Sequence, residues 1–181
     1  MMLSASHPLP AIPAWRWWVN LGAFQAAWFA TVLGAAQGFT WLAPLAVLAA
    51  VGLHLALTRR RLAELRLLLV AAGLGFVFEH ALLFAGLVRY AGDPSWVPLW
   101  MLALWPLFAT TLNVSLAWFR PRPLLAALAG AVAGPLAYAG GEALGAIRLE
   151  GLALWALALG WAVAFPLLLT LARRIERGAS A

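Results

Sequence analysis

Long apolar runs separated by short polar links make up the chain from residue 17 to residue 172. A helix needs roughly 20 apolar residues to cross about 30 Å of hydrocarbon. Six segments have approximately that length, and the pattern therefore predicts an all-α integral membrane bundle of six transmembrane helices. These segments are 17–36, 41–58, 67–88, 97–118, 123–145 and 151–172.

The links between the expected helices are only a few residues long. Successive helices should therefore run antiparallel as neighbours, with no room for a soluble domain between them. We expect one six-helix transmembrane domain over 16–172, a short cytoplasmic tail at 1–15 before it, and a basic cytoplasmic C-terminus at 173–181.

The composition agrees with a membrane protein. The chain is 65% hydrophobic and 10% charged, whereas soluble domains are about 45 to 50% apolar and about 25% charged. The formal charge of +6 does not indicate a nucleic-acid partner, because every basic residue is an arginine in a short link between apolar runs. The lipid bilayer is the expected partner.

The arginines gather in alternate links, on one side of the predicted bundle. The links on the other side are balanced, with Arg89 against Asp93 and Arg148 against Glu150. The positive-inside rule therefore predicts that both termini are cytoplasmic. The clustered arginines are Arg59, Arg60, Arg61, Arg120, Arg122, Arg173, Arg174 and Arg177.

Two titratable residues, Glu79 and His80, stand side by side in the middle of the third expected span. With about 1.5 Å of rise per residue, both fall within roughly 2 to 4 Å of the bilayer midplane. An acid at this depth costs on the order of 3 kcal/mol and is a functional-site hypothesis by default. We expect Glu79 to face the interior of the bundle.

Adjacent helical residues do not face one another, so Glu79 and His80 should make separate contacts. Gly75 and Gly86 are predicted to share the helix face of Glu79 and to admit another backbone there. His54, near the cytoplasmic end of its span, is expected to be hydrated. The candidate ligand-binding residues, some of which would otherwise only join helices, are Glu79, His80, Asn113, Tyr138, Glu142 and Gln25.

A stripe of small residues follows one side of the fifth expected span. Such a seam lets helices approach closely. It also offers a contact surface for a second copy of the chain or for another membrane protein. Its glycines are Gly130, Gly134, Gly141 and Gly145.

Several kinds of chemistry find no support in the sequence. The chain has no cysteine, which excludes disulfides and thiolate metal sites. His54 and His80 differ by roughly 10 Å in predicted depth, too far for a haem held by two histidines. No nucleotide-binding or hydrolase motif occurs. We expect no metal and no cofactor.

A buried polar cluster centred on Glu79 is therefore predicted to bind a small or lipid-like molecule. An intramembrane acid–base enzyme acting on a lipid or isoprenoid, a proton-coupled carrier and a non-catalytic scaffold stay open as alternatives. A cavity that opens sideways to lipid at the level of Glu79 would favour a lipid binder or an enzyme over a carrier.

Three stretches carry a resemblance to a known family. They contain N-x-x-x-F-Q-x-x-W-F from residue 20, L-W-x-x-F-A-x-T-L from residue 104 and G-P-L-x-Y from residue 134. With them the chain resembles small polytopic bacterial inner-membrane proteins known as a domain of unknown function. The resemblance implies a multi-pass protein of the inner membrane, and an acid in the third span that Glu79 would match. It implies no reaction.

Overall fold

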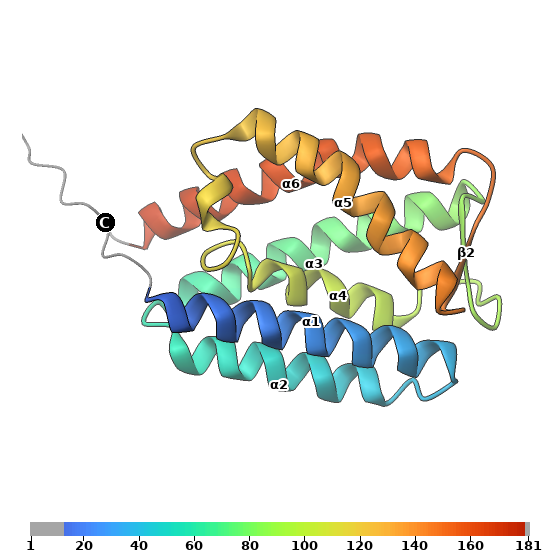
Figure 1. Ribbon diagram of the computed structural model, residues 1–181, viewed down its shortest axis with the longest axis horizontal. Coiled ribbons are helices and arrows are strands. Elements are labelled where there is room, and N and C mark those ends of the chain that lie inside the picture. The colour runs from blue at the N-terminus through green and yellow to red at the C-terminus, as the bar shows by residue number, and fades with distance from the viewer. Residues whose placement is uncertain (1–12, 180–181) are drawn as a thin grey trace, which may run out of the picture.

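The computed structural model describes residues 13–179, and over that range the chain forms a bundle of six α-helices (Figure 1). The predicted helical class is confirmed. The helices are α1 (Ala14–Ala36), α2 (Leu42–Leu57), α3 (Arg61–Phe84), α4 (Leu99–Ala109), α5 (Pro123–Ala143) and α6 (Ala153–Gly178). Most of the predicted N-terminal tail lies outside the described residues.

The helices pack as three antiparallel pairs along one long axis. α1 lies on α2 and α5 lies on α6, while α3 and α4 lie between these two layers (Figure 1). α3 also contacts α6, and α4 also contacts α1 and α2. The central pair therefore joins the two outer ones.

Four of the helices, α1, α3, α5 and α6, are long and apolar enough to cross a membrane. The other two are shorter, with 16 residues in α2 and 11 in α4. The predicted fourth span, 97–118, is wrong in its second half. The helix ends at Ala109, turns follow, and a short 3₁₀ helix, η1 (Ala117–Phe119), comes next.

The early end of α4 has local causes. Pro106 has no backbone N–H to donate to the preceding turn. The hydroxyls of Thr110 and Thr111 donate to the carbonyls of Leu107 and Phe108, at 2.7 and 2.6 Å. In a continuous helix, one face would carry Pro106, Thr110 and Asn113. Because α4 ends at Ala109, these three residues do not share a helix face.

Side chains of α1 satisfy the irregular backbone that follows α4. Asn20 Nδ2 donates to the carbonyl of Thr110 at 3.0 Å, and Asn20 Oδ1 accepts from the hydroxyl of Ser115 at 2.7 Å. The Trp17 indole donates to the carbonyl of Ser115 at 2.9 Å. Non-helical backbone inside a membrane protein is stable only where it is buried and paired in this way.

Two short strands, β1 (Val88–Tyr90) and β2 (Ile147–Leu149), add to the helices a small sheet that the sequence did not predict. They pair antiparallel, with Val88 opposite Leu149 and Tyr90 opposite Ile147. Gly86, at a φ of 68°, makes the left-handed turn that leads from α3 into β1. Gly86 therefore lies outside the helix and does not share the face of Glu79.

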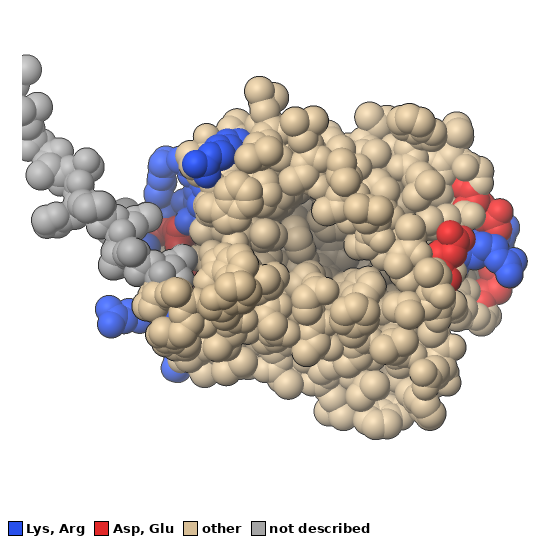
Figure 2. Space-filling model, in the orientation of Figure 1, with Lys and Arg blue, Asp and Glu red and all other residues tan. Residues whose placement is uncertain are grey.

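Charged side chains lie at the two ends of the bundle. Figure 2 shows mainly basic groups at the end that holds the start of α1 and the end of α6, and a mixture of acids and bases at the opposite end. The face between them shows no charge. This is the surface expected of a protein with an apolar belt around its middle.

Two stacked indoles fill the centre of the bundle. The rings of Trp105 in α4 and Trp161 in α6 lie 5.1 Å apart at an angle of 18°. A glycine lies against each ring. A Cβ added to Gly75 in α3 would come within 2.1 Å of the Trp105 ring, and one added to Gly134 in α5 within 2.4 Å of the Trp161 ring. Gly75 thus admits an indole, where the sequence predicted a backbone.

Replacing either of these glycines by alanine should destabilise the bundle. A methyl group at Gly75 or Gly134 must displace a ring that is itself stacked, at a cost of about 1–3 kcal/mol. Gly73 is the matched control in the same helix α3, because an added Cβ there meets nothing within 4 Å. We expect Gly73→Ala to leave the free energy of unfolding unchanged or slightly higher, as measured by SDS titration of the purified protein. Equal stability of all three variants would contradict the packing argument.

Candidate functional site

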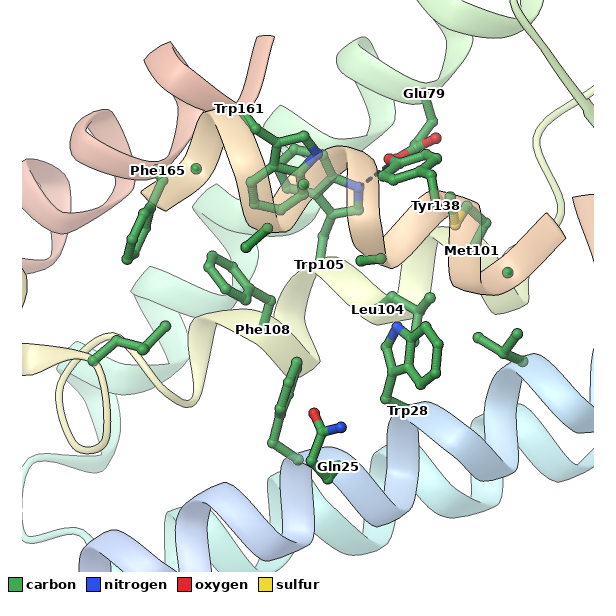
Figure 3. A pocket seen from close by; sticks show the side chains of 18 of the residues that line it. Gln25, Trp28, Glu79, Met101, Leu104, Trp105, Phe108, Tyr138, Trp161 and Phe165 are labelled. Carbon is green, nitrogen blue, oxygen red and sulfur yellow. Dashed lines mark hydrogen bonds between the residues drawn. The ribbon is translucent and has the colours of Figure 1, made fainter. Parts of the chain in front are cut away.

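The carboxyl group of Glu79 is fully buried and accepts three hydrogen bonds. The Tyr90 hydroxyl donates to Oε2 at 2.8 Å and the Trp105 indole N–H donates to Oε1 at 2.9 Å. The Tyr138 hydroxyl also donates to Oε1. The donors come from β1, α4 and α5, so Glu79 joins α3 to three other elements. Figure 3 shows the donors of α4 and α5, Trp105 and Tyr138, beside Glu79.

Local structure explains each donor. Gly75 stands one helical turn before Glu79 and leaves the space that the Trp105 ring occupies. The turn at Gly86 reverses the chain after α3, so that Tyr90 returns to the level of Glu79. Tyr138 lies on the side of α5 that faces the bundle and is buried. The site therefore depends on both glycine positions and on the strand pair.

Within residues 13–179, none of the ion pairs between an arginine or histidine and an acid includes Glu79. Tyr90 lies in β1, outside the helices, where burial raises the pKa of its hydroxyl and the Glu79 carboxylate raises it further. Tyr90 therefore remains a neutral donor at physiological pH.

A cavity of about 360 Å³ adjoins Glu79 and Tyr138. Its walls come mainly from α1, α4, α5 and α6, and they are almost entirely apolar and aromatic (Figure 3). Figure 2 shows it as a hollow in the uncharged face, midway between the charged ends. The cavity thus opens sideways, through the apolar belt.

Three of the six predicted site residues line this cavity: Glu79, Tyr138 and Gln25. Glu79 and Tyr138 are hydrogen-bonded to each other, whereas Gln25 projects from α1 on the opposite side of the cavity (Figure 3). The other three, His80, Asn113 and Glu142, do not line it. The single cluster expected from the sequence is therefore divided among several places.

His80 and Glu79 make separate contacts, as helical geometry predicts. The Nδ1 atom of His80 lies 2.8 Å from the carbonyl of Phe76, which can only accept, so this nitrogen carries the proton. The imidazole ring packs against the rings of Phe76, Phe84 and Trp96. His80 thus belongs to an aromatic cluster on another side of α3.

Asn113 belongs to a buried polar network near the arginine-rich end. Its amide donates to Oε1 of Glu64 at 2.8 Å and its oxygen accepts from Arg120. His54 Nε2 lies 3.0 Å from Oε2 of Glu64, and both side chains are buried. The expectation of a hydrated His54 is therefore wrong. Arg120 extends the network to Glu176 in α6.

The spacing of His54 and Glu64 could have revealed this pair. The two residues stand at almost equal distances before and after the short link between α2 and α3. In an antiparallel helical hairpin such positions face each other. Sequence reasoning overlooked the pair because it considered the depth of each residue separately.

Glu142 lies at the end of the bundle opposite the arginine clusters and is exposed. Its carboxylate accepts the backbone N–H of Leu149 in β2 at 2.7 Å. It lines a separate polar depression together with Arg89, Asp93 and Arg148. Glu142 and Glu79 therefore do not share a cavity.

The glycine stripe of α5 packs inside the molecule. Gly130 and Gly134 lie against Trp161 of α6, and Gly141 lies against Ile147 of β2. Gly145, at a φ of 85°, makes the turn after α5. The seam is thus occupied by other parts of the same chain.

Sequence reasoning missed Tyr90, Trp105 and Trp161. In membrane proteins tryptophan is enriched at the level of the headgroups. The sequence therefore did not indicate that Trp105 and Trp161 lie at the centre of the bundle. Within the described part of the chain, no group of three or more His, Asp or Glu side chains lies close enough to hold a metal ion.

Comparison with known proteins identifies the family of the chain. A family model described as "Protein of unknown function (DUF2878)" matches residues 17–167. The match includes Glu79, its three donors and every residue that lines the cavity. No curated protein and no solved structure matches the chain.

Two substitutions of Glu79 should differ sharply in stability. Glu79→Leu leaves the donors of Tyr90, Trp105 and Tyr138 without an acceptor, and we expect a loss of about 3 kcal/mol. Glu79→Gln keeps an oxygen for Trp105 and Tyr138, and its amide can donate to the Tyr90 oxygen. We expect it to lose about 1 kcal/mol or less.

SDS titration of both variants checks this prediction, with the wild-type chain as the reference. Equal losses for the leucine and the glutamine variant would show that the three hydrogen bonds do not determine the stability of the site.

Proposed function

We propose that this chain, which belongs to the DUF2878 family of proteins of unknown function, is a multi-pass membrane protein that takes up a hydrophobic molecule from the bilayer. The family match confirms the resemblance to a domain of unknown function. The molecule enters the cavity beside Glu79. The proposal has two parts, the placement in the membrane and the use of the cavity.

The placement follows from helix length and charge. Four helices are long enough to cross a bilayer, and α2, at about 24 Å, is only slightly short. The remaining crossing of the membrane is made by α4 together with the turns that follow it. α1 begins and α6 ends at the same end of the bundle, as an even number of crossings requires (Figure 1).

The exposed arginines support one orientation. Arg59, Arg61, Arg122, Arg173 and Arg174 are exposed where α2 ends, α3 and α5 begin, and α6 ends. The positive-inside rule places this end in the cytoplasm, together with both termini. We propose the inner membrane of a bacterium as the location.

One observation carries the binding function: the cavity opens sideways, midway between the charged ends (Figure 2). A molecule dissolved in the bilayer can reach such an opening without passing through water. A carrier with alternating access would need openings towards the two aqueous sides. The observed opening favours a protein that binds a molecule from the membrane.

The contacts of Glu79 favour binding over acid–base catalysis. All three of its hydrogen bonds come from the protein, so they hold the carboxyl in one place. A general acid must lie within hydrogen-bond reach of the substrate atom that it protonates, and the three protein donors already occupy the Glu79 oxygens. A scaffold with an outward-facing glycine seam also has less support, because Gly130 and Gly134 face Trp161.

Filling the cavity should abolish uptake. Ala137 on α5 lines the cavity, and Ala137→Phe would place a ring in it. Leu136→Phe is the matched control, since Leu136 is the next residue, does not line the cavity and is 64% exposed. We expect at least tenfold weaker binding in the first variant and unchanged binding in the second.

The probe is 9,10-dibromostearyl alcohol, whose bromine atoms quench tryptophan fluorescence on contact. Trp28, Trp100, Trp105 and Trp161 line the cavity, so its occupation should give a saturable component of quenching. Identical saturable quenching in both variants, with the purified full chain in neutral detergent, would refute uptake at this site.

A further inference from the structure

We infer that the hydrophobic molecule is a lipophilic organic cation; this inference rests on the proposed function. The cavity contains one acid and no base. Among the described residues that line it, Glu79 is the only Asp or Glu, and none is an arginine or a histidine. The walls therefore carry at most one charge, and its sign is negative.

The hydrogen bonds of Glu79 fit an ionised carboxyl. The Trp105 indole N–H can only donate, and both tyrosine hydroxyls lie within hydrogen-bond distance of the carboxyl oxygens and can donate to them. Three donors supply what an acceptor-only carboxylate needs. They do not supply a positive charge, and a buried charge without a partner is costly. A cation in the adjoining cavity would be the missing partner.

The aromatic walls favour a cation over a neutral molecule. The faces of aromatic rings attract positive charge, most strongly for tryptophan, and the attraction increases where water is excluded. An aliphatic wall would bind an apolar body equally well but would not distinguish its charge. The tryptophans that line the cavity are Trp28, Trp100, Trp105 and Trp161, and phenylalanines line much of the rest.

The same features disfavour anionic lipids. A phosphate or carboxylate headgroup in the cavity would face Glu79 and would meet no arginine or histidine. The basic side chains visible in Figure 2 lie at the two ends of the bundle, away from the hollow. The ligand class that fits is a quaternary ammonium, a phosphonium or a protonated amine on an apolar body.

Two probes of nearly identical shape and opposite charge test this inference. Tetraphenylphosphonium is the cation and tetraphenylborate is the anion. Both are titrated into the purified full chain in neutral detergent, and binding is measured by equilibrium dialysis. The amount that Ala137→Phe still binds is partition into the micelle and is subtracted. We expect one tetraphenylphosphonium per chain, and at least tenfold weaker binding of tetraphenylborate.

Glu79→Gln should lower the ratio of tetraphenylphosphonium affinity to tetraphenylborate affinity by at least tenfold, because the substitution removes the charge and keeps most of the hydrogen bonds. Glu142→Gln is the control, since Glu142 is an acid outside the cavity. It should leave the binding of both probes unchanged. The comparison of the two probes on the wild-type chain is decisive even where Glu79→Gln folds poorly.

The outcomes separate the inference from the proposed function. Equal binding of both probes that Ala137→Phe abolishes would overturn the cation and keep the cavity as a binding site. Cation binding that Glu79→Gln leaves intact would also overturn the inference. Binding of both probes that Ala137→Phe leaves unchanged would overturn the inference and the proposed function together.

Discussion

The burial of one carboxyl group is the constraint on which the rest of this structure depends. Glu79 has no exposed surface, so its acceptors must be satisfied by the protein. α3 cannot supply the donors from its own turns, and they come from Tyr90, Trp105 and Tyr138. Each donor fixes the position of a different element relative to α3. The small sheet, the short α4 and the inward side of α5 are all needed to complete this one site.

The two indoles connect the hydrogen bonding of Glu79 to the packing of the helices. Trp105 reaches Glu79 while stacked on Trp161, and the pair extends from Gly75 in α3 to Gly134 in α5. Small residues on both sides are needed because two stacked rings occupy the space where helices would otherwise touch. The same α5 glycines that accept the stack also line the cavity beside it. Hydrogen bonding, packing and the hollow therefore share one set of residues.

The sequence predicted the helices, apart from the second half of the fourth span, but it did not predict the site. Apolar runs predicted all six helices because burial in hydrocarbon selects composition directly, and Glu79 stood out because an acid is rare in such a run. Depth along a helix did not reveal which neighbour a side chain meets, so His80, Asn113 and Glu142 were grouped wrongly with Glu79. Tyr90 was out of reach, because its role depends on a strand pairing between two links far apart in the chain.

The early end of α4 also contributes to the cavity. Leu116, the last residue of the irregular turns, and Phe119 in η1 line the cavity together with residues of α1 and α5. A helix continued to residue 118 would present its side chains in a different direction along the bundle axis. The irregular backbone is stable inside an apolar belt only because Asn20 and Trp17 form hydrogen bonds with its carbonyl groups. Polar side chains of α1 near the arginine-rich end thus stabilise the backbone beside an apolar cavity near the middle of the bundle.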